Sequence, residues 1–324
     1  MLHGLITGSM PDPATPDDHG GFRGTASYSA VLTAKGRMVT DLRAFSLAGP
    51  EERLLLEVPS TGAEAFAAHF GRFVPPRMAR WTDLSDATAM LTVMGPDAPG
   101  LLAESMRPSL SGALTSMAEL EYFQLDGRAA EDVGQGAPGE PRLGALIVRT
   151  ADVAVPAFDI LIDEDRAPGL LERFVLSGAV PIEGNVWETL RVEAGRPAFG
   201  VDMLDDTLPP EAGIQDRAID HTKGCYTGQE VIVRIRDRGH VNRSLRGLIL
   251  GGAPLPPRGT QLVDQAGKQL GWITSAVASP GRGERLGLGY VRREVEPPAQ
   301  LHLGEPGGPI VEVRELVGAG WAND

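Results

Sequence analysis

The sequence predicts an α+β protein that ends in a small antiparallel β-barrel or sandwich. Strand and helix patterns are mixed over the first 244 residues. The last 80 residues instead hold six or seven short β-rich runs between glycines and prolines, with no helical period. A chain of 324 residues is also longer than one typical domain. We therefore expect three units, at residues 1–86, 87–244 and 245–324.

Composition narrows the function classes. A formal net charge of −13 argues against broad electrostatic attraction to nucleic acids or anionic membranes. No apolar run approaches the ~20 residues that span a bilayer, and the first residues lack the apolar core of a signal peptide. A single cysteine excludes an internal disulfide and a cysteine metal site. We expect a cytoplasmic protein with no bound metal, no membrane contact and no direct nucleic-acid binding.

In the first unit, residues 26–47 contain two apolar, β-branched runs on either side of residues 34–36, which is the pattern of a β-hairpin. A third strand is expected at residues 53–58. Ser60 or Thr61 then caps a helix that carries three phenylalanines on one face.

The middle unit mixes both element types. The expected strands lie at residues 78–84, 89–94, 145–150 and 157–163, with further strand signals at 113–125. The expected helices lie at residues 96–106, 168–177 and 184–195. In helix 168–177 the inward positions are Leu170, Leu171, Phe174 and Val175. Asn185 is the predicted N-cap of the last helix and Gly195 its end. Residues 127–144 have the composition of a mobile surface loop.

The stretch KGCYTGQE, residues 223–230, places one of three lysines two residues before the only cysteine. Its second half fits the capping box, in which the Thr227 hydroxyl and the Glu230 carboxylate satisfy free backbone donors at a helix start. A helix is therefore expected to begin at Gly228. The alternative is a strand, because the residues that follow are rich in β-branched side chains.

Cys225 would then lie just before a helix N-terminus, close to Lys223 and to His221. Positive charge favours the thiolate over the thiol, which predicts a reactive cysteine. The alternative is a buried, inert side chain, since free cysteine is among the most buried residue types.

Six cationic or titratable side chains follow within 13 residues, at Arg234, Arg236, Arg238, His240, Arg243 and Arg246. Arginine binds carboxylates and phosphates with two parallel hydrogen bonds, so this cluster is a candidate anion site. The alternative is a solvated face balanced by nearby acidic residues.

KGCYTGQE closely resembles the signature of the YgfZ-type folate-binding proteins, which are relatives of the glycine-cleavage aminomethyltransferase. The motif residues are Lys223, Gly224, Cys225, Tyr226, Gly228, Gln229 and Glu230. The similarity extends over most of the chain, in the expected order. It includes YSAVLTAKGRMVTD, LTVMGPDAPGLL, LRVEAGRPAFGVDM and LGWITSAVASPGRGERLGLGYVRRE.

The resemblance implies a three-lobed, ring-like fold with a C-terminal barrel and a central tetrahydrofolate site. It also implies an accessory role in the assembly or repair of iron–sulfur enzymes, including tRNA-modifying ones, which would be the protein partners. The glutamate of the LRVEAG run holds the pterin in such proteins, which carries over to Glu193. A carboxylate suits this role because it accepts two parallel hydrogen bonds. Lys223 and Asp41 are further candidate folate contacts.

Two alternatives remain beside this interpretation. One is an active one-carbon transferase that uses Asp41 and Glu193. The aminomethyltransferases carry an Asp-Asp pair where this chain has Thr40-Asp41. The missing first carboxylate argues against one-carbon transfer. The other is a scaffold whose folate pocket has decayed. By the same comparison the chain begins late in its first lobe, so we also expect the native start codon to lie upstream.

Overall fold

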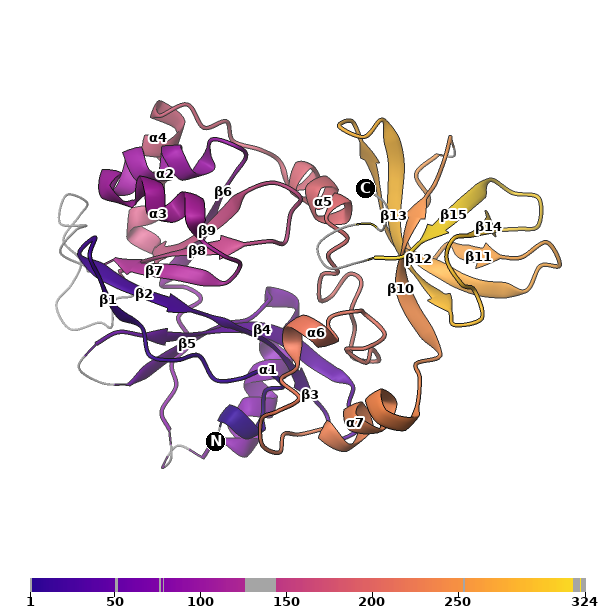
Figure 1. Cartoon of the computed structure of the whole chain (residues 1–324), viewed down its shortest axis with the longest axis horizontal. Coiled ribbons are helices and arrows are strands. Elements are labelled where there is room, and N and C mark those ends of the chain that lie inside the picture. The colour runs from indigo at the N-terminus through magenta and orange to yellow at the C-terminus, as the bar shows by residue number, and fades with distance from the viewer. Residues whose placement is uncertain are drawn as a thin grey trace.

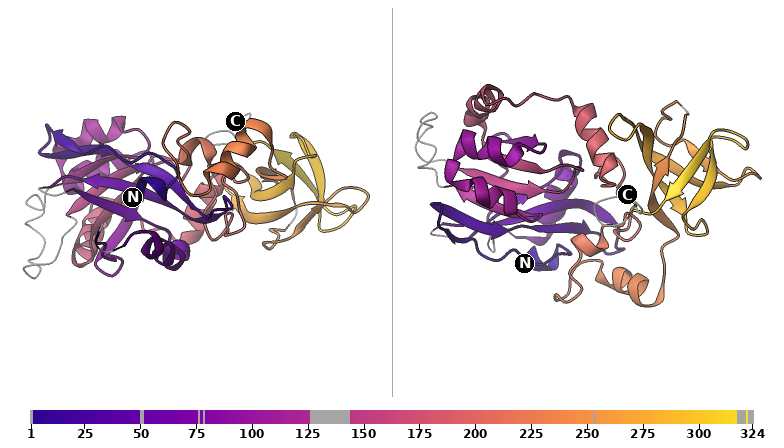
Figure 2. Two further views of the ribbon diagram at one scale, coloured as in Figure 1. Left: turned by 90° about the horizontal axis from the view of Figure 1, so that it is seen from below. Right: turned by 45° about the horizontal axis from the view of Figure 1, so that its top comes forward.

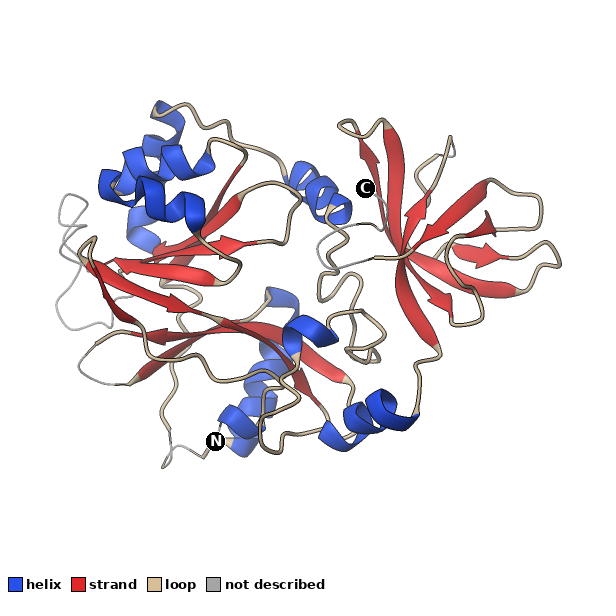
Figure 3. Ribbon diagram, in the orientation of Figure 1, coloured by secondary structure: helices blue, strands red, loops and turns tan. Residues whose placement is uncertain are grey.

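The computed structural model describes residues 2–49, 52–75, 77, 79–125, 144–252, 254–316 and 321. Two β-sheets face each other, helices cover their outer faces, and a separate β-barrel lies at one end (Figures 1 and 3). Both views in Figure 2 show the barrel beside the two sheets rather than over them. The fold is thus the predicted α+β arrangement of lobes with a C-terminal barrel.

The first sheet has three antiparallel strands, and helix α1 packs on its outer face through the cluster around Leu56, Phe66 and Phe70. Its elements are η1 (Leu2–Gly4), β3 (Ser27–Leu32), β4 (Met38–Leu47), β5 (Arg53–Glu57) and α1 (Ser60–Phe73). The predicted hairpin and third strand are confirmed. The predicted cap is wrong: Pro59 occupies the N-cap position, and no side chain there bonds to the helix start.

The second sheet has six antiparallel strands in the order β1-β2-β7-β8-β9-β6. Their bounds are β1 (Thr15–Asp17), β2 (Gly21–Thr25), β6 (Thr88–Met94), β7 (Glu121–Leu125), β8 (Ala145–Thr150) and β9 (Ala157–Asp163). Strands β1 and β2 come from the beginning of the chain, yet β2 pairs with β7, so the sheet order does not follow the chain order. The divisions at residues 86 and 244 stay predictions.

Helices cover the outer face of the six-stranded sheet, and their apolar side chains form one core with it. They are α2 (Ala98–Met106), η2 (Pro108–Leu110), α3 (Ser111–Ser116), η4 (Glu164–Arg166) and α4 (Ala167–Leu176). The inner faces of the two sheets meet at Phe45, Tyr122 and Leu146. An ion pair between Arg43 on β4 and Asp159 on β9 also joins them, at 2.7 Å.

Three helices connect the sheets to the barrel: α5 (Gly184–Glu193), α6 (Gln215–Ala218) and α7 (Gln229–Arg238). The barrel is closed and antiparallel, which decides between the predicted barrel and sandwich. Its strands are β10 (Arg243–Ile249), β11 (Gln261–Val263), β12 (Gln269–Ser279), β13 (Glu284–Arg292), β14 (Ala299–Leu303) and β15 (Ile310–Arg314).

Several local predictions fail. Residues 79–84 form no strand, and residues 111–116 are helical. Glu183 rather than Asn185 is the N-cap of α5, although Gly195 does end that helix with a φ of 66°. On α4, Leu171 and Val175 are 46% and 44% exposed, because the helix turns only the neighbouring stripe toward the sheet. The predicted loop at residues 127–144 lies almost entirely outside the described residues.

Within the described part of the chain, no helix has both the length and the apolar character needed to cross a membrane. The same residues contain no group of three or more histidine, cysteine, aspartate or glutamate side chains arranged to hold a metal ion.

Candidate functional site

Asp41 and Tyr28 form the centre of the candidate site, on the inner face of the three-stranded sheet. Asp41 on β4 is opposite Ala30 in the β3–β4 register, so Tyr28 is its diagonal neighbour on the same face. The Tyr28 hydroxyl donates a hydrogen bond of 2.7 Å to Asp41 Oδ2. Asp41 is 8% exposed, and its other oxygen, Oδ1, is buried without a hydrogen-bond partner among the described residues.

Four further charged residues complete what we call the central polar cluster. The Arg217 guanidinium lies over the Tyr28 ring, 4.7 Å from its centroid. Arg217 on α6 pairs with Glu119, and both Arg196–Glu119 and Arg217–Asp152 pairs are 3.5 Å long. The cluster therefore comes from six segments: β3, β4, α6, the turn after α5, and the connections α3–β7 and β8–β9.

Burial changes the protonation of this cluster. It raises the pKa of the Asp41 carboxyl from 3.8 to about 6, outweighing the hydrogen bond from Tyr28, which lowers it. Desolvation and the Asp41 carboxylate together raise the pKa of Tyr28 well above its usual value. A carboxyl group that titrates near neutral pH can accept or release a proton, which suits acid–base chemistry.

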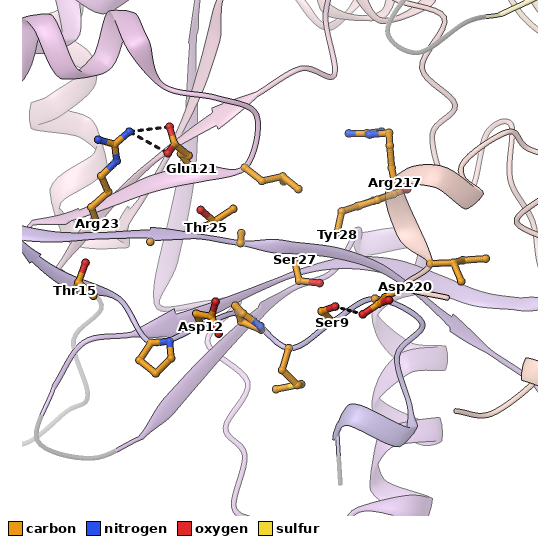
Figure 4. Close-up of a pocket in the computed structure, with 18 of the residues that line it drawn as sticks. Ser9, Asp12, Thr15, Arg23, Thr25, Ser27, Tyr28, Glu121, Arg217 and Asp220 are labelled. Carbon is orange, nitrogen blue, oxygen red and sulfur yellow. Dashed lines mark hydrogen bonds and ion pairs between the residues drawn. The ribbon is translucent and has the colours of Figure 1, made fainter. Parts of the chain in front are cut away.

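A pocket of about 640 Å³ opens beside the cluster, between the first residues of the chain and strand β2 (Figure 4). Tyr28 and Arg217 lie at one end of it, and the Arg23–Glu121 ion pair, 2.9 Å long, lies at the other. Hydroxyl and carboxylate side chains line the space between them, including Thr25, Ser27 and Asp220. Tyr28 and Arg217 thus belong to both the pocket and the cluster.

Glu193 is the last residue of α5 and is partly buried. The hydroxyl of Ser279, at the end of barrel strand β12, donates a hydrogen bond to its Oε1. The chain continues from Glu193 through Gly195 to Arg196, which belongs to the central polar cluster. The predicted pterin-binding residue therefore lies between the barrel and the cluster.

The KGCYTGQE segment lies elsewhere, between α6 and α7 and beside the first residues of the chain (Figure 1). Cys225 is exposed, which contradicts the buried alternative. Lys223 Nζ donates to the backbone carbonyls of Ile6 and Gly8, at 2.8 and 2.6 Å, and lies 5.7 Å from the Tyr226 ring centroid. Burial lowers the pKa of Lys223 to about 8, although the Asp220 carboxylate opposes the shift.

The helix after this motif is confirmed and the strand alternative is wrong, but its start differs from the prediction. Gly228 is the N-cap, and no side chain caps the helix. The Thr227 hydroxyl instead contacts the Gly4 carbonyl at 3.4 Å, and Glu230 pairs with Arg234 at 2.8 Å. Gly228 has a φ of 84°, and a Cβ there would lie 2.7 Å from the Thr33 carbonyl oxygen, so this position requires glycine.

The remaining motif residues have mainly packing roles. Tyr226 is buried in the core below the β3–β4 hairpin, together with Ile232 of α7. Gly224 is exposed, and a Cβ added to it would lie 3.5 Å from the His3 ring. Gln229 is the first residue of α7. Among the described residues, no hydrogen bond or ion pair joins any two of Asp41, Glu193 and Cys225.

The arginine cluster after the motif is largely neutralised in place. Arg236 pairs with Asp237 at 2.6 Å, Arg243 pairs with Asp206 and Glu211 at 3.1 Å each, and Arg246 pairs with Glu315 at 3.5 Å. This favours the alternative of a face balanced by acidic residues over an anion site.

Sequence analysis proposed Asp41 and Glu193 as folate contacts through the family resemblance, but it did not single out the residues around them. Tyr28 had a usable signal, because the hairpin turn sets the register that makes it diagonal to Asp41. Glu119, Asp152 and Arg217 had none, since they come from connections and a short helix far apart in the sequence.

Two facing α+β lobes, a polar cluster between them and a C-terminal barrel define the class of the aminomethyltransferase-like folate-binding fold. The family described as "GCVT N-terminal domain" matches residues 20–223, and "Glycine cleavage T-protein C-terminal barrel domain" matches residues 243–308. The chain belongs to the glycine cleavage T-protein family. This confirms the predicted superfamily, whereas the YgfZ type stays a prediction.

Individual relatives carry the same family name. The aminomethyltransferase of Rubrobacter xylanophilus is 30% identical over 275 residues, which cover 84% of this chain and 68% of that protein. The aminomethyltransferase of Streptomyces coelicolor is 26% identical, with 83% and 68% covered. The crystal structure of the glycine cleavage system aminomethyltransferase T from Bartonella henselae is similar with a TM-score of 0.74 at 22% identity, covering 92% of this chain and 77% of that one, which shows the shared fold.

Proposed function

We propose that the protein binds tetrahydrofolate and takes part in one-carbon transfer of the aminomethyltransferase type. The observation that carries this proposal is the buried Asp41 carboxylate, whose Oδ1 has no partner among the described residues while its Oδ2 accepts from Tyr28. A buried acceptor without a partner costs about 1–3 kcal/mol, which a donor on a ligand would offset. The aminomethyltransferase relatives support the same proposal.

The donor and acceptor set suits a folate. The pterin ring of a folate presents adjacent N–H donors, and the Glu193 carboxylate can accept two parallel hydrogen bonds from them. Tetrahydrofolate supplies the ring and bridge nitrogens that carry a one-carbon unit. Asp41, with a pKa of about 6, is mostly ionised at pH 7 and can accept a proton from a bound group. Lys223 stays a proposed contact to the anionic tail of the folate. Two of its three N–H donors bond to backbone carbonyls, which leaves one for a ligand.

The absent first carboxylate does not oppose this proposal. Successive side chains of a strand point to opposite faces, and Thr40 lies on the α1 side, where its Oγ1 would meet a Cβ added to Gly62. Asp41 points the other way, toward Tyr28. An aspartate at position 40 would therefore face α1 rather than stand beside Asp41.

Calorimetric titration of tetrahydrofolate tests the binding proposal. Glu193→Ala is expected to weaken binding by roughly 10- to 100-fold, because charge-assisted hydrogen bonds are lost. Glu230→Ala is the matched control, since that carboxylate is 85% exposed on α7, and it should bind like the wild type. Absence of binding by the wild type would refute the proposal, and equal binding by Glu193→Ala would refute the role of Glu193.

One observation favours a second candidate function, that of a folate-binding accessory factor for iron–sulfur enzymes, including tRNA-modifying ones. Cys225 is exposed within KGCYTGQE, whereas Asp41 is buried, so the thiol is open to a partner protein. A single thiolate is too few for a cluster held by this chain alone. In cells that lack the protein, the Cys225→Ala variant should fail to restore iron–sulfur enzyme activity. Full rescue by that variant would refute this candidate.

A further inference from the structure

The C-terminal barrel holds Glu193 through one buried serine. Ser279 is 2% exposed and donates its hydroxyl hydrogen to Glu193 Oε1. The Ser279 hydroxyl oxygen in turn accepts a hydrogen bond of 3.1 Å from the backbone N–H of Arg282. A hydroxyl has one hydrogen to donate, so this second contact leaves it directed at the glutamate.

The helix turn that carries Glu193 is itself anchored on the barrel. Arg191, 1% exposed, donates to Asp202 at 2.7 Å and to Ser275 of β12 at 2.9 Å. The Trp321 indole N–H donates to the Val192 carbonyl at 3.2 Å. Three consecutive residues of α5 therefore bond to the barrel or to residues packed on it, and Figure 1 shows α5 lying against this side of the barrel.

The carboxylate needs such support. Glu193 ends a helix, where its negative charge meets the negative end of the helix dipole. Within the described part of the chain, its one hydrogen bond is the one from Ser279. A carboxylate has about four lone-pair sites, so after this bond Oε2 and the second site on Oε1 are still available to a ligand.

We propose that Ser279 is a positioning residue of the folate site: the barrel serine sets the rotation of the Glu193 carboxylate, so that its free lone pairs are presented to the pterin N–H donors. This rests on the proposed role of Glu193 in binding tetrahydrofolate. It gives the barrel a part in ligand affinity through a residue that does not itself touch the folate.

A double-mutant cycle tests this positioning role by calorimetric titration of tetrahydrofolate. Ser279→Ala is expected to raise the Kd roughly 10-fold in the wild-type background, because the carboxylate loses its orienting bond. In the Glu193→Ala background the same change should have no effect on the Kd. Ser279→Thr keeps the hydroxyl and should restore binding to within about threefold of the wild type.

Ser275→Ala is the matched control, because Ser275 is a buried serine of the same strand that bonds to Arg191 and Asp202 but not to Glu193. In this variant Arg191 keeps its bonds to Asp202 and Glu188, so the turn that carries Glu193 stays anchored. The variant should lower the melting temperature and leave the Kd unchanged. An unchanged Kd in Ser279→Ala would overturn the proposal, as would an equal loss in the Glu193→Ala background or in Ser275→Ala. Should Ser279→Ala fail to fold, the nearly isosteric Ser279→Cys, a weaker donor, must raise the Kd for the proposal to stand.

The outcomes also separate this proposal from the one it rests on. If the wild type does not bind tetrahydrofolate, the proposed function itself fails. If the wild type binds and Glu193→Ala weakens binding while Ser279→Ala does not, only the positioning role of Ser279 is refuted.

Discussion

The central polar cluster and the KGCYTGQE segment are built in opposite ways. The cluster collects buried side chains from six separate segments, and burial shifts the pKa of its key carboxyl, Asp41, to about 6. KGCYTGQE is eight consecutive residues whose thiol is exposed. Its lysine bonds to the backbone carbonyls of residues 6 and 8, and Gly228 allows close approach to the backbone of Thr33. The more visible motif in the sequence thus offers surface chemistry, and the less visible cluster offers tuned acid–base chemistry.

The largest effect is expected from the substitution that removes the acid–base group of the cluster, the Asp41 carboxyl. Asp41→Asn keeps an acceptor for Tyr28 but cannot take up a proton, so the rate of one-carbon transfer to tetrahydrofolate should fall by about 10²–10⁴-fold. Spectrophotometric detection of the methylenetetrahydrofolate product measures this. Asp237→Asn, which changes an exposed carboxylate on α7, should transfer at the wild-type rate. Equal rates for Asp41→Asn and the wild type would show that the cluster has no acid–base role.

The second effect appears in stability. The folded state raises the pKa of Asp41 above its unfolded value, so folding binds a proton between about pH 4 and pH 6, and stability is lost as the pH rises through this window. A shift from 3.8 to about 6 corresponds to roughly 3 kcal/mol at 1.36 kcal/mol per unit. Asparagine does not titrate, so the free energy of unfolding of Asp41→Asn, relative to that of the wild type, should rise by up to this amount between pH 4 and pH 7. Parallel urea denaturation curves at the two pH values check it, and a constant difference would contradict the raised pKa.

The smallest effect concerns the exposed thiol. Because Cys225 is exposed, Cys225→Ala should change the free energy of unfolding by no more than about 0.5 kcal/mol and leave the tetrahydrofolate Kd unchanged. The native wild type should react with iodoacetamide at one site, and the variant at none. Loss of folate affinity in Cys225→Ala would remove the contrast between the two regions, since the thiol would then act in the folate site.

Local sequence patterns predicted elements better than their ends. The β3–β4 hairpin, the barrel, α5 and α7 follow from turn residues and periodicity. The predicted caps at Ser60, Asn185 and Thr227 all fail. A cap needs its side chain to turn back onto the helix, and at Thr227 the Gly4 carbonyl of a distant segment is a competing partner.

By itself the sequence determined the class of fold and the order of its parts, because these depend on patterns within a few residues of each other. Through the family resemblance it also proposed two carboxylates, Asp41 and Glu193, as folate contacts. Only the tertiary structure decided that Asp41 is buried beside Tyr28, that Glu193 is held by Ser279 across 86 positions of chain, and that Cys225 is exposed. Burial and hydrogen bonding are properties of packing between distant segments, and packing alone sets the protonation and orientation on which the proposed chemistry depends.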